Sequence, residues 1–443
     1  MPKSSILRIG AAGLAIAGLT VPLVACSSEP ATTSPDLAEQ TIEVWTRSDE
    51  TAAVNYEAIF EAFTEATGIK VDYVPDPDLA TRLQTAAAAG DLPDLVINDA
   101  SSLGSYQTQG LLVKVDSSTV DPDGLVGEEL WESVVGIDGE TYGVPYSRHV
   151  IGAGIRTDWL ESLGLEEPTT LEEFTEVASA FSAEDPDGDG QDNSDGWSVA
   201  LSSESGYAAW WTAPFIWSYG GDLVTDNGDG TYTSAILDDA TVEGVEAAKQ
   251  LVCTEPRVVQ ADAITATTGK AADLFYSGGA GIYSMGPWQM KGLDTNVGAE
   301  NWTVVAPASG PEGTQALAEG ENVYLMAGSE VPVAQLALAE FLVSAEGQKI
   351  GMTAGDVPSV RLSVNSTLDA GEVRDDERWA NIQEIYEESG HAFPSAIDFA
   401  PIRSAAGETL NATYADCSSD VAAQLASLDD AVTEILDEQG VLG

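Results

Sequence analysis

The chain has 443 residues, of which 73 are acidic and 17 basic, and its formal net charge at pH 7 is −56. So acidic a surface repels nucleic acid, because binding to phosphates requires clustered lysine and arginine. Hydrophobic residues make up 44% of the chain, which is ample for a packed core. About 400 residues follow the N-terminal segment, more than one typical core holds, so we expect two lobes.

The N-terminus carries two basic residues and then an apolar run over residues 9–25. This pattern is typical of a secretory signal peptide, and the run is short for a spanning helix, which needs roughly twenty residues. Leu23–Cys26 (LVAC) resembles the lipobox of bacterial lipoproteins, which implies cleavage before Cys26 and a lipid anchor on it. An ordinary signal peptide with an incidental cysteine is the alternative. Residues 26–40 are rich in Ser, Thr and Pro and are interpreted as a flexible tether.

Two cysteines, Cys253 and Cys417, remain beyond residue 26. In an exported chain an even pair favours a disulfide, and this one would close a long loop. Two separate buried thiols are the alternative.

Hydrophobic periodicity predicts alternating strands and helices after the tether. This order indicates a sheet with parallel strands covered by helices, which binds ligands beyond the carboxyl ends of its strands. Those ends are Trp45–Arg47 and Asn98–Asp99. The predicted elements are a strand at 41–45, a helix at 53–67, a strand at 69–74, a helix at 79–89 and a strand at 94–97.

The second part of the chain begins near residues 141–155, which hold strand-like apolar runs. Thr170 and Glu173 predict a capping box at the start of a helix over 170–182. The tail is predicted to be an amphipathic helix over 421–436, with one apolar face formed by Val421, Leu425, Leu428, Val432 and Leu436. Between them we expect a Trp-rich helix, a hairpin around 227–230, a helix at 240–253, a strand and aromatic turn within 273–290, and one long helix within 329–354.

Several segments, in this order and spacing, resemble the carbohydrate-uptake type of bacterial extracellular solute-binding protein, similar to maltodextrin-binding proteins. Among them are FEAFTEATGIKVDYV, LQTAAAAGDLPDLVIND and YSGGAGIYSMGPW. The resemblance implies an α/β, two-lobe periplasmic-binding-protein-like fold of type II, with a ligand cleft between lobes joined by crossing strands. It places the crossings near 144–148, 304–307 and 349–358. Lobe 1 would then be 41–146 with 307–350, and lobe 2 would be 147–306 with 351–443.

The resemblance also implies a function. The chain would be a binding protein and not an enzyme, a monomer on the extracytoplasmic face of the membrane that delivers a sugar or oligosaccharide to the permease subunits of an ABC importer. It has no Gly-Lys-Ser/Thr phosphate loop, so the ATPase must be another polypeptide. One alternative is a receptor for a non-sugar solute such as a polyamine or glycerol phosphate. A secreted glycoside hydrolase is another, because 73 acidic residues leave room for its pair of carboxylates.

Aromatic side chains are the first candidates for the site, because sugars present apolar C–H faces to flat rings. The resemblance implies that Trp288, in the GPW turn, stacks on the ligand. Trp210 and Trp211 are adjacent on a helix, so one can face the cleft while the other packs inside. Trp45 lies on the same side of its strand as Arg47. Trp217, Trp302 and Phe399 are expected in the core.

Polar candidates would bind the hydroxyl groups of a sugar. Arg47 can bind two hydroxyls at once or form a surface ion pair. Arg148 lies at the first implied crossing, where the family usually has an acidic residue, so the substrate stays open. The other polar candidates are Asn98, Asp99, Tyr146, Glu321 and Asn322.

The acidic loop DPDGDGQDNSDG over 185–196 carries aspartates at alternating positions, which is typical of calcium loops. The glutamate expected at the twelfth position is absent, and Gly196 stands there. A structural calcium ion would be the cofactor of this chain, and a solvated acidic turn is the alternative. The candidate ligands are Asp185, Asp187, Asp189, Gln191 and Asp195.

Overall fold

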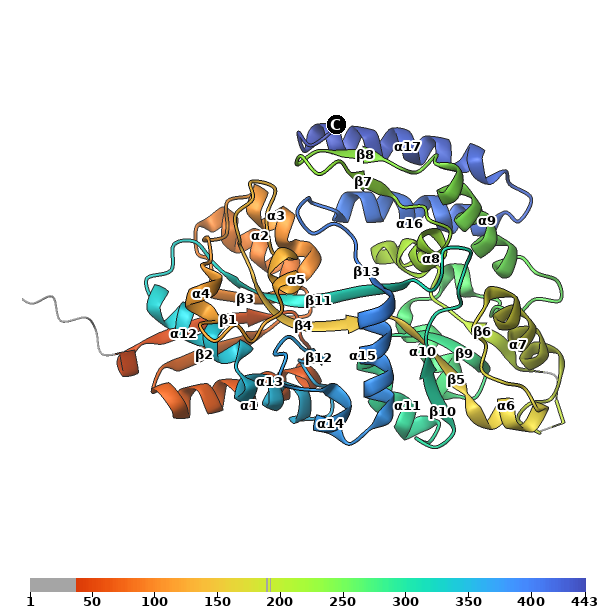
Figure 1. Ribbon diagram of the computed structural model, residues 1–443, viewed down its shortest axis with the longest axis horizontal. Coiled ribbons are helices and arrows are strands. Elements are labelled where there is room, and N and C mark those ends of the chain that lie inside the picture. The colour runs from red at the N-terminus through yellow and green to blue at the C-terminus, as the bar shows by residue number, and fades with distance from the viewer. Residues whose placement is uncertain (1–36, 189, 192) are drawn as a thin grey trace, which may run out of the picture. The chain divides into compact units, whose positions relative to one another are not determined.

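The computed structural model describes residues 37–188, 190–191 and 193–443 (Figure 1). The predicted signal peptide and Cys26 lie outside the described residues, as does most of the tether. No helix in the described ranges is long and apolar enough to cross a membrane. Residues 37–443 form one unit that contains two larger sheets and a short hairpin.

The larger sheet has seven strands and mixed orientation. Its order is β12-β4-β11-β3-β1-β2, with β13 paired to β11. β1 is parallel to both β2 and β3, as predicted, whereas β11 is antiparallel to β3 and β4. The strands are β1 (Thr41–Thr46), β2 (Lys70–Pro75), β3 (Leu95–Asp99), β4 (Val144–Val150), β11 (Ala316–Leu325), β12 (Leu362–Ser363) and β13 (Gly390–His391).

The predicted helices between the first strands are present as α1 (Glu50–Thr67) and α2 (Leu79–Ala89). Asp49 caps α1, and its carboxylate accepts hydrogen bonds from the backbone N–H groups of residues 51 and 52. Gly68 and Gly90 end the two helices at φ +80° and +69°, a left-handed conformation that favours glycine. The same part of the chain holds α3 (Leu103–Thr108), α4 (Ser117–Val120) and α5 (Glu128–Glu132).

The smaller sheet has four strands in the order β10-β5-β9-β6. Its strands are β5 (Gly152–Arg156), β6 (Asp195–Ser198), β9 (Ala280–Met285) and β10 (Trp302–Val305). The capping box predicted for the helix α7 (Leu171–Ala183) is present, with Thr170 and Glu173 as its members. The remaining elements here are α6 (Thr157–Leu163), α8 (Tyr207–Ser218), the hairpin β7 (Val224–Asp226) and β8 (Tyr232–Ser234), α9 (Asp239–Val252), α10 (Thr268–Tyr276) and α11 (Met290–Asn296).

The chain passes between the two sheets more than once. It leaves β4 and enters β5 across a single residue, Ile151, and it returns between β10 and β11. After residues 349–358 it pairs with β4 again at Leu362. The helix α15 (Glu377–Ser389) follows α14 (Ala370–Arg374) and packs against both β4 and β10 (Figure 1). The lobe boundaries that the resemblance implies stay a prediction.

The prediction of one long helix within 329–354 is wrong. The segment forms two helices, α12 (Pro332–Val343) and α13 (Ala345–Thr353), which are separated at Ser344. Ser344 has an extended backbone, and its hydroxyl accepts a hydrogen bond from the backbone N–H of Gly347. A serine that caps a new helix competes with continuation of the old one, and hydrophobic periodicity does not record this competition.

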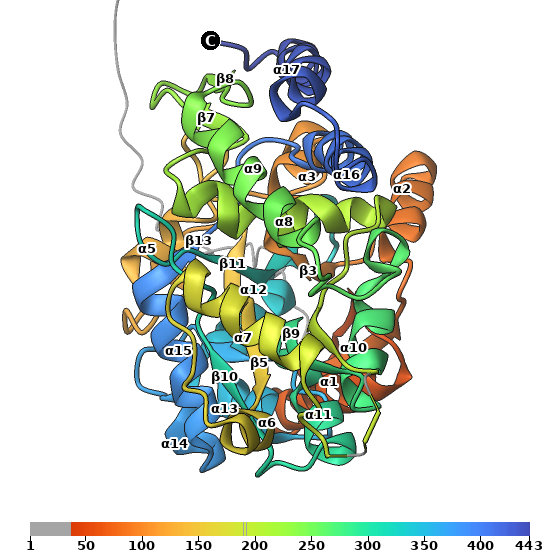
Figure 2. The same cartoon turned by 90° about the vertical axis from the view of Figure 1, so that its right-hand side faces the viewer.

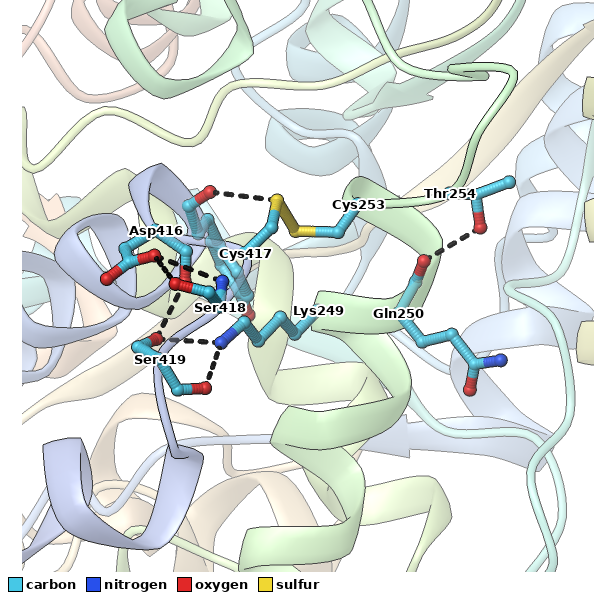
Figure 3. The surroundings of a disulfide bond; sticks show 9 residues. Lys249, Gln250, Cys253, Thr254, Asp416, Cys417, Ser418 and Ser419 are labelled. Atoms are coloured by element: carbon cyan, nitrogen blue, oxygen red, sulfur yellow. Dashed lines mark hydrogen bonds between the residues drawn. A yellow bond between two sulfur atoms is a disulfide. The ribbon is translucent and has the colours of Figure 1, made fainter.

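The C-terminal helices α16 (Ala400–Ala415) and α17 (Val421–Glu438) pack together and against α8 and α9 (Figures 1 and 2). All five residues of the apolar face predicted for α17 are buried. A disulfide joins Cys253, after α9, to Cys417, in the turn between α16 and α17 (Figure 3). Beside it, the ammonium group of Lys249 donates hydrogen bonds to the backbone oxygen and hydroxyl of Ser419, at 2.6 and 2.7 Å.

Candidate ligand-binding cleft

A cavity of about 380 Å³ lies beyond the carboxyl ends of the parallel strands β1 and β3. Arg47, Asn98 and Asp99 line one side of it, because they directly follow or end these strands. Asp398 and Arg403, at and near the start of α16, line it as well. The cavity is therefore bounded by two regions of the chain about 300 residues apart, in the position where α/β sheets bind ligands.

Arg47 and Asp99 form an ion pair at this cavity, with 2.5 Å between Nη2 and Oδ1. The Asp99 carboxylate raises the pKa of Arg47 above its usual value. The Arg47 side chain is 48% exposed and that of Asp99 33% exposed. Because the ion pair is in contact with solvent, it contributes little to stability. Arg47 and Asp99 can therefore separate and bind the hydroxyl groups of a ligand instead at little energetic cost.

Asn98 is buried at the edge of the same cavity. Its amide nitrogen donates hydrogen bonds to the hydroxyl of Tyr106 at 2.7 Å and to that of Ser102 at 3.1 Å. Its Oδ1 has no hydrogen-bond partner among the described residues. This oxygen is itself buried, so it is one of the rare unpaired buried acceptors and is not open to a ligand in this structure.

A second cavity of about 90 Å³ adjoins the first and shares Asp99 and Ser101 with it. Arg148, Glu319 and Tyr386 also line it. Arg148 is 5% exposed, and burial lowers the pKa of its guanidinium. Arg148 belongs to the implied crossing on β4, and Asp99 ends β3. Both residues line the same small cavity.

Glu319 and His149 face each other on the paired strands β11 and β4, with 3.9 Å between Oε2 and Nε2. Burial is the main cause that raises the pKa of Glu319 to about 8, and the negative charge of Asp99 adds to it. Burial also lowers the pKa of His149. Both side chains are therefore largely uncharged at neutral pH.

The candidate tryptophans divide into two groups. Trp210 is partly buried and lines neither cavity itself, but the guanidinium of Arg403, which lines the larger cavity, lies 5.4 Å from its ring. Trp288 is partly buried and meets the ring of His149 edge-on at 5.3 Å, but it lines neither cavity. Trp45 and Trp211 are buried, at 6% and 4% exposure. The predicted core residues Trp217, Trp302 and Phe399 are also buried.

Three further polar candidates lie inside the protein. Tyr146 is fully buried, and its hydroxyl is 2.7 Å from that of Ser359. Asn322 is fully buried and accepts a hydrogen bond from Arg148 at 3.1 Å. Glu321 is 6% exposed, and Arg361 forms an ion pair with it at 3.1 Å. These side chains are buried and do not line either cavity.

Several cleft residues escaped the sequence analysis. Glu319 lies two positions before Glu321, so strand alternation on β11 could have identified it. His149, which faces Glu319, lines neither cavity, and alternation places it on the opposite side of β4 from Arg148. Arg403 and Tyr386 belong to α16 and α15, and no local pattern links them to strands that are far away in the sequence.

The predicted calcium loop is only partly described, because Asp189 lies outside the described residues. The carboxylate of Asp185 accepts a hydrogen bond from the backbone N–H of Gly190 at 3.0 Å. Asp195 begins β6, and burial raises its pKa. Among the described residues no group of three or more His, Cys, Asp or Glu is arranged to hold a metal ion. Asp187 and Gln191 have interaction partners of their own. Calcium binding therefore stays a prediction.

The fold and the cleft define a binding protein of the two-lobe type II class. The chain is a member of the bacterial extracellular solute-binding proteins, since the model of this family matches residues 58–380. This membership confirms the predicted family and places the chain among extracytoplasmic binding proteins and not among enzymes.

Two relatives are similar to this chain over part of their length. The polygalacturonan/rhamnogalacturonan-binding protein YtcQ of Bacillus subtilis is 32% identical over 49% of this chain and 44% of its own. The fructooligosaccharide ABC transporter substrate-binding protein FusA of Streptococcus pneumoniae is 27% identical over 38% of each chain. The chain thus spans less than half the length of these relatives.

Solved structures agree in fold over nearly the whole chain. The GacH receptor of Streptomyces glaucescens, known unliganded and with acarbose, has a TM-score of 0.74 at 20% identity and covers 90% of this chain and 99% of its own. A solute-binding protein of an ABC transporter from Thermotoga lettingae, bound with α-D-tagatose, has a TM-score of 0.72 at 18% identity, with 90% and 100% covered. At these identities the likeness shows the fold alone, and it confirms the predicted class.

Proposed function

We propose that this chain captures a sugar or oligosaccharide outside the membrane and delivers it to the permease of an ABC importer. The observation that carries the proposal is the cavity of about 380 Å³ beyond β1 and β3, which is lined by the partly exposed pair of Arg47 and Asp99 and by the side chain of Asn98. Paired charges and amides that face a cleft suit the hydroxyl groups of a neutral or weakly charged sugar. The names of the relatives, which refer to polygalacturonan, rhamnogalacturonan and fructooligosaccharide, support this class of ligand.

A thermal-unfolding screen tests the proposal. A ligand that binds only the folded state stabilises it by RT ln(1 + [L]/Kd), which is about 2.7 kcal/mol at a hundredfold excess over Kd. We expect a rise in Tm with at least one oligosaccharide and no rise with spermidine or glycerol 3-phosphate. Chromatography of the incubated sugar should show no product. A rise with the polyamine or phosphate alone, or the appearance of cleaved sugar, would overturn the proposal.

Variants of the cleft separate ligand binding from stability. Asp99→Asn removes the partner of Arg47 and should weaken sugar binding by about tenfold, the size of one charged hydrogen bond. Glu340→Gln, an exposed acid on α12, makes the same chemical change away from the cleft and serves as the control. If Asp99→Asn and Glu340→Gln bound the sugar with equal affinity, the ligand would bind outside this cavity.

We also propose that a lipid on Cys26 holds the protein at the outer face of the membrane, as a monomer. The lipobox resemblance of Leu23–Cys26 and the tether that follows it support this anchoring. A Cys26→Ser variant should be released from membranes into the medium. Retention of that variant on washed membranes would contradict the lipid anchor.

A further inference from the structure

Arg148 is a buried cation for which the described part of the chain supplies no counter-ion. Its side chain donates hydrogen bonds to the backbone oxygens of Ser147 and Glu321, to Oδ1 of Asn322 and to the hydroxyl of Ser133. These four acceptors are uncharged, and so is the hydroxyl of Tyr386, which also forms a hydrogen bond with Arg148. No carboxylate of a described residue forms an ion pair with it, although the chain carries more than four acids for each base.

The carboxylates nearest in the fold are engaged or neutral. Asp99 lines the same small cavity, but it forms its ion pair with Arg47. Glu321 is adjacent on β11 and forms its ion pair with Arg361. Glu319 also lines the cavity, and burial raises its pKa to about 8, so that at pH 7 it is mostly protonated. The positive charge of Arg148 therefore stays uncompensated in a site that is almost closed to water.

The backbone is shaped to hold the guanidinium in this place. Gly320 lies opposite Arg148 in the pairing of β11 with β4. A Cβ at Gly320 would lie 2.7 Å from Nη1 of Arg148 and 2.3 Å from the backbone oxygen of Ser147, so a larger residue would displace both. The guanidinium lies against the strand at the wall of the cavity, which has a volume of about 90 Å³. One water needs only roughly 10–15 Å³ of such space, so a carboxylate fits.

An uncompensated buried charge is costly, and an arginine binds a carboxylate through strong, charge-assisted hydrogen bonds. We propose that the ligand of the cleft carries a carboxylate, as uronic acids do, and that this group enters the small cavity and binds Arg148. The proposal rests on the sugar-binding function above and specifies the chemical class of the sugar.

Calorimetry with the full chain tests the proposal. The probes are trimers of galacturonate, glucuronate and mannuronate, each with its fully methyl-esterified form, and the trimers of the corresponding neutral sugars. We expect at least one free acid to bind about ten- to a hundredfold more tightly than its ester. Because the net charge of −56 repels anions, the general field of the protein cannot produce this preference.

Two variants assign the preference to one residue. Arg148→Gln should abolish the difference between acid and ester, because both forms then meet an uncharged side chain, so the readout is the ratio of the two affinities. Arg257→Gln removes the same charge from an exposed residue away from both cavities and should leave the difference intact. Where Arg148→Gln does not fold, the comparison of acid with ester in the unaltered chain still tests whether the ligand carries a carboxylate.

The experiment distinguishes failure of the carboxylate proposal from failure of the proposed sugar-binding function. Tight binding of a neutral trimer or an ester without preference for any acid would overturn the proposed carboxylate and leave the sugar-binding function intact. Binding of none of the sugars would overturn both.

Discussion

Glu321 and Arg361 form an ion pair inside the protein, with 3.1 Å between Oε1 and Nη1 and side chains that are only 8% and 12% exposed. The hydroxyl of Tyr56 donates a further hydrogen bond to the same carboxylate, at 3.2 Å. The Arg47–Asp99 pair has the same chemistry on the open side of the cleft. The two pairs should therefore respond differently to the loss of one charge.

We predict that Glu321→Gln lowers the free energy of unfolding by about 3–5 kcal/mol, because it leaves Arg361 charged and buried without a partner. Asp99→Asn should lower it by less than about 1 kcal/mol, because that pair is exposed. Denaturant unfolding at pH 7 measures both values. Similar losses for the two variants would show that burial does not decide the strength of these pairs.

Glu319 should make the stability depend on pH. Its folded pKa of about 8 lies above the usual 4.5, so between these values the folded state holds a proton that the unfolded state has lost. The free energy of unfolding then falls as pH rises through this window, by less than about 5 kcal/mol in total.

Glu319→Gln removes this contribution. The variant should be about as stable as the unaltered chain at pH 5 and more stable by a few kcal/mol at pH 9. Urea unfolding at the two pH values measures the difference, and Glu340→Gln, on the exposed face of α12, is the control. A constant difference between Glu319→Gln and the unaltered chain at both pH values would contradict the raised pKa.

The adjacent tryptophans of α8 should separate binding from folding. Trp211 is 4% exposed and packs near Trp197 and Phe215, so Trp211→Ala should cost about 3–5 kcal/mol of stability. Trp210 stands beside Arg403, and Trp210→Ala should instead weaken the affinity for the sugar. Unfolding and calorimetry on both variants, each the control of the other, test this assignment. It would be wrong if Trp211→Ala lost affinity and kept its stability.

The disulfide should stabilise the C-terminal helices. It closes a loop with a sequence separation of 164 residues, and loss of such a bond typically costs about 2–5 kcal/mol. The double variant Cys253→Ser with Cys417→Ser should therefore unfold at lower denaturant concentration, and reduction of the unaltered chain should reproduce this shift. An unchanged midpoint in both experiments would show that the bond contributes nothing to stability.

Local patterns predicted much of the fold. Alternation and helical periodicity identified β1, α1, β2, α2 and β3, and they identified the buried face of α17 residue by residue. They failed at Ser344, where a single side chain that bonds to the backbone ends one helix and begins another. Periodicity records which residues of an element are buried. It does not record a capping hydrogen bond, which can end the element although the apolar pattern continues.

Part of the cleft was also accessible from the sequence. Arg47, Asn98 and Asp99 were expected there because parallel strands end at one edge of a sheet. The same reasoning could not distinguish them from Tyr146 and Asn322, which are polar but fully buried. Whether a polar side chain on a strand meets a cavity or another strand depends on what pairs with it, and that partner lies elsewhere in the chain.

The sequence by itself indicated the α/β class and the strand ends where a ligand would bind, because these follow from short-range periodicity. Its resemblance to a known family implied the family and the two-lobe type. Only the tertiary structure decided which side chains meet in the cleft. It placed Arg403 beside Trp210, paired Asp99 with Arg47 and left Arg148 without a carboxylate partner among the described residues. Charges are compensated through space over a few ångströms, and no pattern along the chain records which charges the fold brings within that distance.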